Sequence, residues 1–292
     1  MTAALKAPAL SSTLVDRWGL SHIRLIADTH SSLVYRAMRD DVPVIVKTLK
    51  PEGRGERPGM DFLRWRDGLG AIKVIAQDHD TALLEDAGHL TLGTYHGEVG
   101  DVIATEIIVD VLQRLHAPSS SPPPAALTPL HVHFDALFSL EKSGPNAAIA
   151  DVIRWSAALA RALLAEQEMV KPLHGDLHHD NIIGGEGGDW IAIDPQGLLG
   201  DPAYDVANVF GNPLGATDEI LDPQRAIRLA RRFAPVLNCT ASKILRFAAA
   251  HAGLSAAWTL QNDLTPSGQT NLDERLGFAR MARSILAEQF VD

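Results

Sequence analysis

The sequence has a single cysteine, Cys239, so no internal disulfide can form. It also has no apolar run approaching the roughly 20 residues that a membrane-spanning helix needs. The opening residues 1–6 are not followed by the apolar core of a secretory signal. We therefore expect a cytoplasmic protein that forms no disulfide and does not enter a membrane.

Basic residues are in the minority among the charged side chains. There are 26 of them against 36 acidic residues, which gives a formal net charge of −10. This balance disfavours a nucleic-acid-binding surface, because the phosphates of nucleic acids bind to clusters of lysine and arginine. The excess of acidic residues is compatible with the binding of a cationic small molecule. A hydrophobic content of 46% over 292 residues is enough for a sizeable core, in one large domain or in two lobes.

One segment in the second half of the chain carries most of the chemistry. It reads Leu173-His174-Gly175-Asp176-Leu177-His178-His179-Asp180-Asn181, and the apolar run 190–193 and then Asp194 follow it. The carboxylate of Asp176 is suited to accept the proton of an attacking hydroxyl. The amide oxygen of Asn181 and the carboxylate of Asp194 are suited to bind Mg²⁺. The segment therefore predicts a phosphoryl-transfer site.

The spacing of these three groups has a structural reason. Residues 184–188 contain four glycines, and glycine adopts the positive φ angles that a tight reversal needs. Residues 181–183 and 190–193 therefore predict the two strands of a hairpin. Such a hairpin brings Asn181 and Asp194 to the same end of a sheet, where a metal ion would bind.

These motifs resemble the aminoglycoside phosphotransferase family, which has the protein-kinase-like fold. The resemblance rests on the His-Gly-Asp-Leu-His-x-x-Asn string, on the Ile-Asp-Pro after it and on Gly-Asp-Pro-Ala-Tyr-Asp at residues 200–205. Within the family, residues 65–68, 83–85 and 194–202 look most like the branch of streptomycin 6-phosphotransferases and hydroxyurea kinases. The resemblance covers roughly residues 20–258.

The resemblance implies an α+β fold of two lobes. Residues 1–88 would form a small, β-rich nucleotide-binding lobe, and residues 89–292 a larger, mainly helical lobe for catalysis and substrate binding. The implied activity is ATP- and Mg²⁺-dependent transfer of the γ-phosphoryl group to a hydroxyl of a small molecule. The expected acceptor is an aminoglycoside such as streptomycin, and the protein would act as a monomer or a homodimer, with no nucleic-acid or membrane partner.

The hydrophobic pattern agrees with this division. The first 88 residues predict one helix near 60–65 and five strands, in the order β-β-β-α-β-β, at 22–26, 33–37, 44–47, 72–75 and 82–84. Apolar residues at helical spacing then predict helices at 98–115 and 151–169, with a Ser/Pro linker at 118–124 between them. Asp222 before Pro223 predicts another helix start, and Asn271 with Glu274 predicts a capping box for the last helix.

Lys47 lies at the end of the apolar run 44–47. By itself, a lysine in such a strand is more often an outward-facing residue than a ligand. The resemblance implies that it pairs with the ATP phosphates and that a carboxylate on a helix holds it in place. Two residues compete for that role. We favour Asp61, which aligns with the longer glutamate of the family, over Glu56, which precedes it by one and a half turns.

The remaining nucleotide contacts are also implied by the resemblance. Residues 28–32, between the first two strands, contain no glycine, and no Gly-x-x-x-x-Gly-Lys string occurs in the chain. The hydroxyls of Ser31 and Ser32 are therefore the candidates for phosphate binding, with a polar hairpin turn as the alternative. Adenine is expected against residues 85–88, where Glu85 is a candidate, although backbone groups would read the edge of the base.

Four further residues have expected roles around the centre. His174 is expected to hold the 173–181 loop by packing and hydrogen bonding, and Asp205 to accept hydrogen bonds from the backbone of that loop, as the matching aspartate does in the fold. A plain helix cap is the alternative for Asp205. Trp258 and Asp263 are candidates for the wall that binds the acceptor, with a solvated helix end as the alternative. Hydroxyurea, a sugar or an amino alcohol would fit the same catalytic centre.

Three rival interpretations fit the residues less well. His174, His178 and His179 with the neighbouring aspartates resemble the ligands of a dinuclear metallohydrolase, but that reading leaves Lys47 and Asp194 unexplained. A non-catalytic nucleotide-binding module would be expected to have lost one of the catalytic groups. A protein kinase would need an activation segment, for which the short stretch between Asp194 and residues 200–202 leaves little room.

Overall fold

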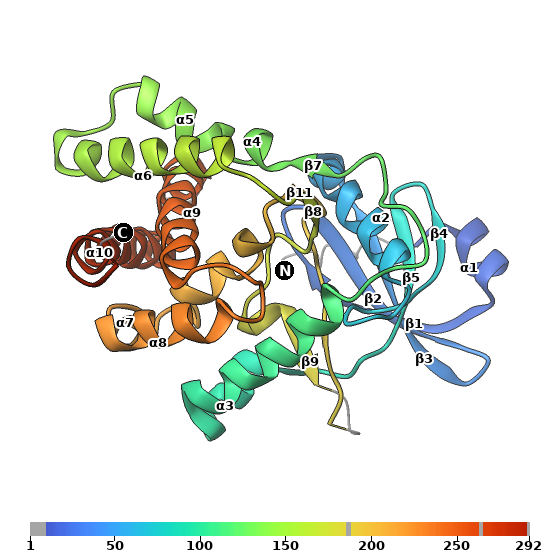
Figure 1. Ribbon diagram of the computed structural model, residues 1–292. Helices are drawn as coiled ribbons and strands as arrows, with labels where there is room; N and C mark the ends of the chain where they lie inside the picture. The colour runs from blue at the N-terminus through green and yellow to red at the C-terminus, as the bar shows by residue number, and fades with distance from the viewer. Residues whose placement is uncertain (1–9, 185–187, 263–264, 291–292) are drawn as a thin grey trace.

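The structure is a computed structural model that describes residues 10–184, 188–262 and 265–290. It has the predicted α+β architecture of two lobes: a small lobe built on an antiparallel sheet lies beside a larger lobe of helices (Figure 1). Within the described ranges, no helix is long and apolar enough to cross a bilayer.

The small lobe confirms the predicted order of elements. Its five strands pair in the order β1-β2-β3-β5-β4 and are β1 (Leu20–Asp28), β2 (Ser32–Arg39), β3 (Val42–Leu49), β4 (Val74–Asp78) and β5 (Thr81–Glu85). Between β3 and β4 lie the short helix η1 (Pro51–Glu56) and the helix α2 (Arg57–Arg66), while α1 (Ser12–Trp18) precedes the sheet. The fourth strand begins two residues later than predicted.

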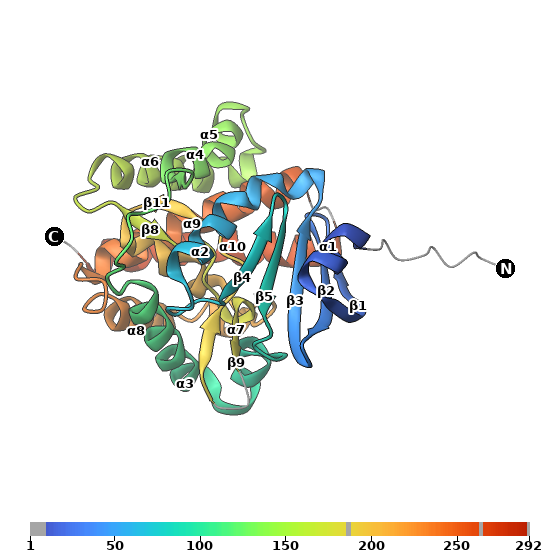
Figure 2. The same ribbon diagram turned by 90° about the vertical axis from the view of Figure 1, so that its right-hand side faces the viewer.

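The two faces of this sheet are covered differently. Val44 and Val46 of β3 belong to a small core with Trp18 of α1, whereas Ile45 and Leu49 pack into the main core with α2 and the helical lobe. Successive side chains of a strand point to opposite faces. Lys47 therefore faces α2 and the helical lobe, not solvent. Figure 2 shows α1 and α2 on either side of the sheet.

The large lobe is organised around one buried helix. This is α9 (Ala241–Asn262), whose residues from Phe247 to Ala257 are all buried. Its many alanines let neighbouring elements approach closely, and the elements packed against it are η3 (Pro202–Gly211), α5 (Asp135–Lys142), α6 (Ala147–Ala165), α8 (Pro223–Phe233) and α10 (Pro266–Gln289). The remaining helices are α3 (Leu92–Leu115), α4 (Leu130–His133) and α7 (Thr217–Ile220).

Two small sheets position the loops between the lobes. One has the order β10-β9-β6, formed by β10 (Trp190–Ala192), β9 (Ile182–Gly184) and β6 (Leu90–Thr91). The other has the order β7-β11-β8, formed by β7 (Thr128–Pro129), β11 (Leu198–Gly200) and β8 (Lys171–Leu173). The predicted hairpin is confirmed, because β9 and β10 pair antiparallel with Ala192 opposite Ile182.

Of the two predicted helix caps, one is confirmed and the other is wrong. The Asp222 side chain caps α8 by accepting from the backbone of Gln224 at 2.8 Å, as predicted. The predicted capping box at Asn271 and Glu274 is wrong, since α10 already begins at Pro266 after the cap residue Thr265. Both side chains instead reach other helices: Asn271 donates to the hydroxyl of Thr259, and Glu274 accepts from Thr217.

The two long helices also differ from their predicted limits. α3 begins six residues before the predicted start at 98, where the Thr91 side chain caps it, and it is interrupted by Gly100 with φ 78° and ψ 170°. α6 begins four residues before the predicted start at 151, capped by Asn146, and ends at Ala165. Both helices are present, and each packs its apolar face into the core, as expected.

Candidate active site

The backbone of the 173–181 loop is held by Asp205 of η3. Its carboxylate accepts from the N–H of His174 at 3.2 Å and from that of Gly175 at 2.7 Å, the contacts expected of it. On the other side, Nε2 of His116 lies 2.9 Å from Asp205 Oδ2. Burial alone would raise the pKa of Asp205, but the His116 hydrogen bond and charge outweigh it and keep the pKa below its usual value. Asp205 is therefore an ionised anchor beneath the loop.

His174 links this loop to the strand that leads to Asp194. Its ring is fully buried. Nε2 lies 2.9 Å from the carbonyl oxygen of Ile193, and Nδ1 accepts from the N–H of Asp176 at 3.2 Å. Burial lowers the pKa of His174, so the ring is neutral, with its proton on Nε2. The histidine thus holds the loop by packing and hydrogen bonding, as expected.

Asp176 lies between two asparagines. Oδ1 accepts from Nδ2 of Asn208 at 2.8 Å, and Oδ2 accepts from Nδ2 of Asn181 at 3.1 Å. Burial raises the pKa of Asp176 to about 6, although these hydrogen bonds and His174 favour the ionised form. The side chain still keeps 29% of its exposure. A carboxylate so held is fixed in orientation and remains accessible from the cleft.

Asn208 was not predicted from the sequence. It lies on η3, a run of ten residues in which nine are buried. Asn208 is the one residue of the run that is only partly buried, and a polar amide within an apolar run was the available signal, because such an amide needs hydrogen-bond partners. Its partner Asp176 is 32 positions away in the chain, so the sequence pattern alone does not indicate the contact.

Asn181 and Asp194 lie at the same end of the β9–β10 hairpin. The N–H of Ile193 donates to the carbonyl of Asn181 at 2.9 Å, which places the residue before Asp194 directly beside Asn181. Asn181 donates through Nδ2 to the backbone oxygen of Asp176, so its amide oxygen points away from that residue. Asp194 has φ 54° and is about half exposed. An amide oxygen and an accessible carboxylate are donors that suit a hard cation such as Mg²⁺.

Lys47 binds two carboxylates, and the helix residue among them is Glu56. Nζ lies 3.1 Å from Glu56 Oε2 and 3.1 Å from Asp194 Oδ1. Burial on its own would lower the pKa of Lys47, but the charges of Asp194 and Glu56 outweigh it and raise the pKa. The lysine is therefore charged and joins the sheet, the start of α2 and the Asp194 strand end.

The preference for Asp61 as the partner of Lys47 is wrong. Asp61 lies 3.9 Å from Arg64 on its own helix and lines a separate hollow of about 830 Å³ between α2 and residues 119–126. The physical reason is the helical repeat. Met60 and Leu63 form the buried face of α2, and Asp61 lies about 100° around the helix from Met60, whereas Glu56 lies one full turn before Met60.

Two glycines bring α2 against the loop after Asp194. A Cβ on Gly59 would lie 1.8 Å from the carbonyl oxygen of Pro195, and a Cβ on Gly197 would lie 2.2 Å from that of Pro58. Gly197 also has φ 68°, a conformation that favours glycine. These close backbone contacts set the distance between α2, which begins directly after Glu56, and the loop that follows Asp194.

The loop at residues 28–32 is closed by its own hydroxyls. Thr29 Oγ1 lies 3.1 Å from Ser32 Oγ and 3.5 Å from Ser31 Oγ, and it accepts from the N–H of Ser32. Lys50 Nζ binds Asp28 at 2.6 Å, and its backbone N–H donates to the carbonyl of Ser31. Ser32 is buried, while Ser31 is partly exposed. Of the two predicted serines, Ser31 is the one that remains accessible.

The expected hinge at residues 85–88 is held by side-chain contacts. Glu85 accepts from the N–H of Lys73 at 2.8 Å, so its side chain is turned toward the neighbouring strand. Asp86 accepts from the N–H of Gly88 at 2.9 Å and binds Arg36 of β2 at 2.6 Å. The Asp86–Arg36 pair was not predicted, since its signal is only an aspartate after a buried strand. Side-chain recognition of a base by Glu85 is not favoured by this orientation.

Of the two predicted residues of the acceptor wall, Trp258 is described and Asp263 lies outside the described residues. The Trp258 ring packs edge-on against the rings of His133 and His251, at centroid distances of 5.1 and 6.1 Å. It is partly buried, so it belongs to the edge of the core. The hydroxyl of Tyr204 lies 2.8 Å from both histidines, which makes a buried polar chain beneath the 173–181 loop.

The histidines of the loop do not converge on one ion. His174 binds Ile193, His178 Nδ1 accepts from the N–H of Asp180 at 3.2 Å, and His179 faces His96 of α3. Of the three, only His179 belongs to a group of possible metal ligands in the described part of the chain. The arrangement therefore gives no support to a dinuclear hydrolase.

The fold and this arrangement of charged groups define a phosphotransferase of the kinase-like type. A model of the aminoglycoside/hydroxyurea antibiotic resistance kinase family matches residues 17–263, and the chain belongs to that family. The predicted family is thereby confirmed. The protein is accordingly a kinase, which transfers phosphoryl groups to hydroxyl groups of small molecules.

Characterised relatives agree with this assignment. The chain is 38% identical over 284 residues to the streptomycin 3''-kinase of Klebsiella pneumoniae, covering 93% of this chain and 100% of that protein. It is 31% identical to the streptomycin 6-kinase of Streptomyces glaucescens, over 77% and 72% of the two chains. The hydroxyurea phosphotransferase of Kitasatospora aureofaciens is 28% identical, over 70% and 61%. Two of these relatives, the streptomycin 6-kinase and the hydroxyurea phosphotransferase, belong to the branch that the sequence motifs suggest.

Solved structures confirm the fold. The choline kinase LicA from Streptococcus pneumoniae superimposes with a TM-score of 0.65 at 17% identity, covering 93% of this chain and 96% of that one. A thermostable mutant of the aminoglycoside phosphotransferase APH(4)-Ia gives a TM-score of 0.62 at 13% identity, covering 94% and 99%.

Proposed function

We propose that the protein phosphorylates streptomycin, with the 3'' hydroxyl as the acceptor. The observation that carries this proposal is the 38% identity over the whole length of a streptomycin 3''-kinase. Identity to the two streptomycin 6-kinases is lower and covers less of each chain. The catalytic groups themselves do not distinguish the two hydroxyls, since the same centre serves either position.

Asp176 is the proposed base. It would orient the acceptor hydroxyl and take its proton as the bond to phosphorus forms. A base with a pKa near the working pH accepts the proton more readily than an ordinary carboxylate, and burial raises the pKa of Asp176 to about 6. Asn181 and Asn208 each hold one carboxylate oxygen. This fixes the carboxylate before substrate arrives, so little reorganisation is needed.

Asn181 and Asp194 would hold Mg²⁺, which would supply neutralisation of the charge on the phosphate oxygens. Their oxygen donors fit the hard cation. Lys47 is charged and lies 3.1 Å from Asp194, so it would bind phosphate oxygens beside the metal. Glu56 holds Lys47 from the other side and replaces Asp61 in the proposed set.

The nucleotide would bind between the lobes, whose boundary we place after Gly88. Ser31 is the favoured hydroxyl for phosphate contact because Ser32 is buried. At the hinge, backbone groups near residues 85–88 would read the adenine, since the Glu85 side chain is bound to Lys73. Trp258 and Asp263 stay the candidates for the acceptor wall, and the acidic net charge of −10 favours a cationic acceptor. Oligomeric state, monomer or homodimer, stays a prediction.

Hydroxyurea is the second candidate acceptor, because a hydroxyurea phosphotransferase is 28% identical over 70% of this chain. It is much smaller than an aminoglycoside and lacks cationic groups. Because both candidates would use the same catalytic centre, a direct competition experiment shows which of the two is the better acceptor.

The test is ADP release from Mg-ATP by the purified protein with streptomycin, other aminoglycosides, hydroxyurea and simple sugar alcohols, each at several concentrations. We expect saturable stimulation by streptomycin that is lost in Asp176→Asn. Mapping the product by phosphorus–proton NMR correlation should place the phosphate on the 3'' position. A phosphate at position 6 would overturn the regiochemistry alone, and stimulation by hydroxyurea only would overturn the acceptor.

A further inference from the structure

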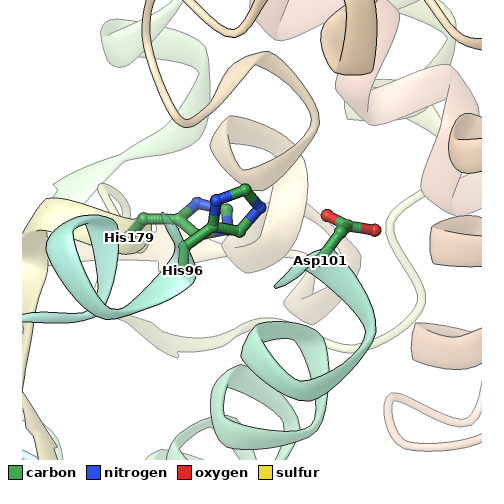
Figure 3. A group of neighbouring side chains, drawn as sticks. All are labelled: His96, Asp101 and His179. Atoms are coloured by element: carbon green, nitrogen blue, oxygen red, sulfur yellow. The ribbon is translucent and has the colours of Figure 1, made fainter. Parts of the chain in front are cut away.

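A second group of possible metal ligands lies behind the 173–181 loop. His96 and Asp101 come from α3, and His179 comes from η2 (His179–Asn181), the short helix that ends at Asn181. One ligand atom from each lies within 4.8 Å of the others. Figure 3 shows the His96 ring in front of the His179 ring, with Asp101 to their right at the start of a helical turn. The ring centroids are 5.4 Å apart and the ring planes are nearly perpendicular.

The kink in α3 creates this grouping. His96 and Asp101 are five residues apart, and Gly100 between them has φ 78° and ψ 170°. A regular helix turns by about 100° per residue, so residues five apart would point away from each other. The left-handed glycine redirects the chain, and Asp101 comes back toward the rings.

Buried polar atoms without hydrogen bonds gather at this place. In the described part of the chain six such side-chain atoms occur, and four of them are here: Nε2 of His96, both ring nitrogens of His179 and Oε2 of Glu219. The other two, on Asp86 and Asp201, are in ion pairs with Arg36 and Lys243, and His96 and Glu219 contact each other in the same way, so the two ring nitrogens of His179 are the atoms of this group that have no partner. His96 Nε2 and Glu219 Oε2 lie 3.0 Å apart. His179 has neither a hydrogen bond nor an ion pair, although it is 0% exposed.

Such a histidine is unusual on energetic grounds. Burying a polar group without a partner is unfavourable, and native structures pair the great majority of such groups. An imidazole with two free nitrogens, aimed at a second imidazole and a carboxylate, has the donor set of a transition-metal site. A cation would bind one ring nitrogen of His179 and would lie beside the existing contact between His96 and Glu219.

We propose that His96, His179 and Asp101, with Glu219 as fourth ligand, bind a divalent metal ion of the zinc class. Imidazole and carboxylate are its usual ligands, in a tetrahedral arrangement with bonds of roughly 2.0–2.2 Å. Ligand atoms in such a site are about 3.3 Å apart by that geometry, and those of His96, Asp101 and His179 lie within 4.8 Å of one another, so the widest pair must close by up to about 1.5 Å. Metal binding therefore requires rotation of the two buried histidines and of the partly exposed Glu219.

The charges nearby set the expected strength. Asp101 already binds Arg225 at 2.7 Å and Arg228 at 2.6 Å. Each carboxylate oxygen has a second lone pair, so Asp101 remains able to coordinate. The two guanidinium groups nevertheless repel a cation, so we expect micromolar binding, weaker than in a structural zinc site without them.

The ion would link the catalytic loop to the helical lobe. His179 lies two residues before Asn181, α3 packs directly against η2, and Glu219 belongs to α7. Cross-linking these three elements would hold η2 in place. The site differs from the proposed Mg²⁺ site in its imidazole ligands, which favour zinc over magnesium, and it does not depend on the proposed acceptor.

The test uses tag-free protein stripped with a chelator. Zn²⁺ binding is measured by competition with a chromophoric chelator, and Co²⁺ is added as a spectroscopic probe of tetrahedral coordination. We expect one equivalent of Zn²⁺, visible Co²⁺ absorption bands and a rise of several degrees in the melting temperature. His96→Ala and His179→Ala should each weaken Zn²⁺ binding at least 10-fold and abolish the Co²⁺ bands. His131→Ala, which alters an exposed histidine on α4, should bind like the unaltered protein.

Two outcomes would overturn the proposal. One is stoichiometric binding that His96→Ala and His179→Ala leave unchanged, which would place the metal elsewhere. The other is the absence of binding above the level of a His96→Ala, His179→Ala double variant. Glu219→Gln guards against misfolding, because Glu219 is 42% exposed and its loss should weaken Zn²⁺ while the far-ultraviolet circular dichroism stays unchanged.

Discussion

Nδ2 of Asn208 donates a hydrogen bond of 2.8 Å to Oδ1 of Asp176. The orientation of this amide is itself fixed, because Asn212 donates to the backbone oxygen of Asn208 at 2.8 Å and to its Oδ1 at 3.1 Å. Since Asn181 holds the other oxygen of Asp176, the carboxylate has one defined position. The proposed base is therefore positioned by η3 as well as by its own loop.

Replacing Asn208 should shift the pH dependence of the reaction. Burial raises the pKa of Asp176 to about 6, and the hydrogen bond from Asn208 opposes that rise. The active form of a base is the ionised one, so kcat/KM of the unaltered protein should fall about tenfold per pH unit below pH ~6. In Asn208→Ala the acid limb should move to higher pH, and the plateau should fall by about 10- to 100-fold, the value of a hydrogen bond to a charged group.

The measurement is kcat/KM for the acceptor between about pH 5 and 9, with the exposed Gln113→Ala as control. An acid limb in Asn208→Ala identical to that of the unaltered protein would contradict the assigned contact.

Asp176→Asn should be far less active yet more stable at alkaline pH. The folded pKa of about 6 lies above the ordinary value of 3.8, so folding favours the protonated form. Stability from this residue is present below pH ~4 and is lost as pH rises through ~6. At pH 8 the unaltered protein carries the cost of a buried charge that asparagine avoids, so the variant should unfold with a free energy about 1–3 kcal/mol higher.

Urea denaturation at pH 8 and near pH 4 measures the difference, with Asp189→Asn as an exposed control. The advantage should shrink toward the lower pH. A variant less stable than the unaltered protein at pH 8 would show that the hydrogen bonds of Asp176 outweigh its burial.

Glu56 and Asp61 form a matched pair for testing the partner of Lys47. Glu56→Gln removes a charge 3.1 Å from Nζ of Lys47, whereas Asp61→Asn removes one that lies on another side of α2. We expect Glu56→Gln to lower kcat/KM for ATP by about 10- to 100-fold, because a charged hydrogen bond contributes about 1.5–3 kcal/mol. Asp61→Asn should remain within about twofold of the unaltered protein, since exposed pairs contribute little. Steady-state kinetics with varied ATP measures both effects. A large loss of kcat/KM in Asp61→Asn with a small one in Glu56→Gln would contradict the assignment of Glu56 as the partner of Lys47.

Gly59→Ala should push the lobes apart. Its Cβ would lie 1.8 Å from the carbonyl oxygen of Pro195, a rigid backbone atom, so α2 or the loop after Asp194 must shift. Overpacking of this kind typically costs about 1–3 kcal/mol of folding free energy. Activity should fall further than stability, because the displaced elements carry Glu56 and Asp194. Gly55→Ala is the matched control, since its Cβ meets nothing within 4 Å; equal melting temperatures and rates for the two variants would argue against the close contact.

The centre of the site was predictable because its residues are close together in the chain. Asp176, Asn181 and Asp194 span 19 positions, and the glycines between the last two specify the hairpin that joins them. The strands of the small lobe were also predictable, since alternating apolar residues and short loops determine them locally. The role of Lys47 was predictable from the family resemblance together with its position in an alternating strand.

Contacts between distant elements were not predictable in the same way. Asp61 was preferred over Glu56 by alignment, but the rotation of α2 against the sheet decides which carboxylate faces Lys47. The capping box at Asn271 and Glu274 had the right residue types, yet tertiary contacts with Thr259 and Thr217 use both side chains. His116 contacts Asp205 and Asn208 contacts Asp176, and the patterns around these two residues indicate only a helix end and a buried run.

The most direct test of the account is the rate of ADP formation from Mg-ATP with and without streptomycin, for the unaltered protein and for Asp176→Asn. We predict saturable, streptomycin-dependent turnover that falls by about 10²- to 10⁴-fold in the variant, the usual contribution of a general base, while both proteins bind ATP equally well. Equal streptomycin-dependent rates in the two proteins would contradict the assignment of Asp176 as the base.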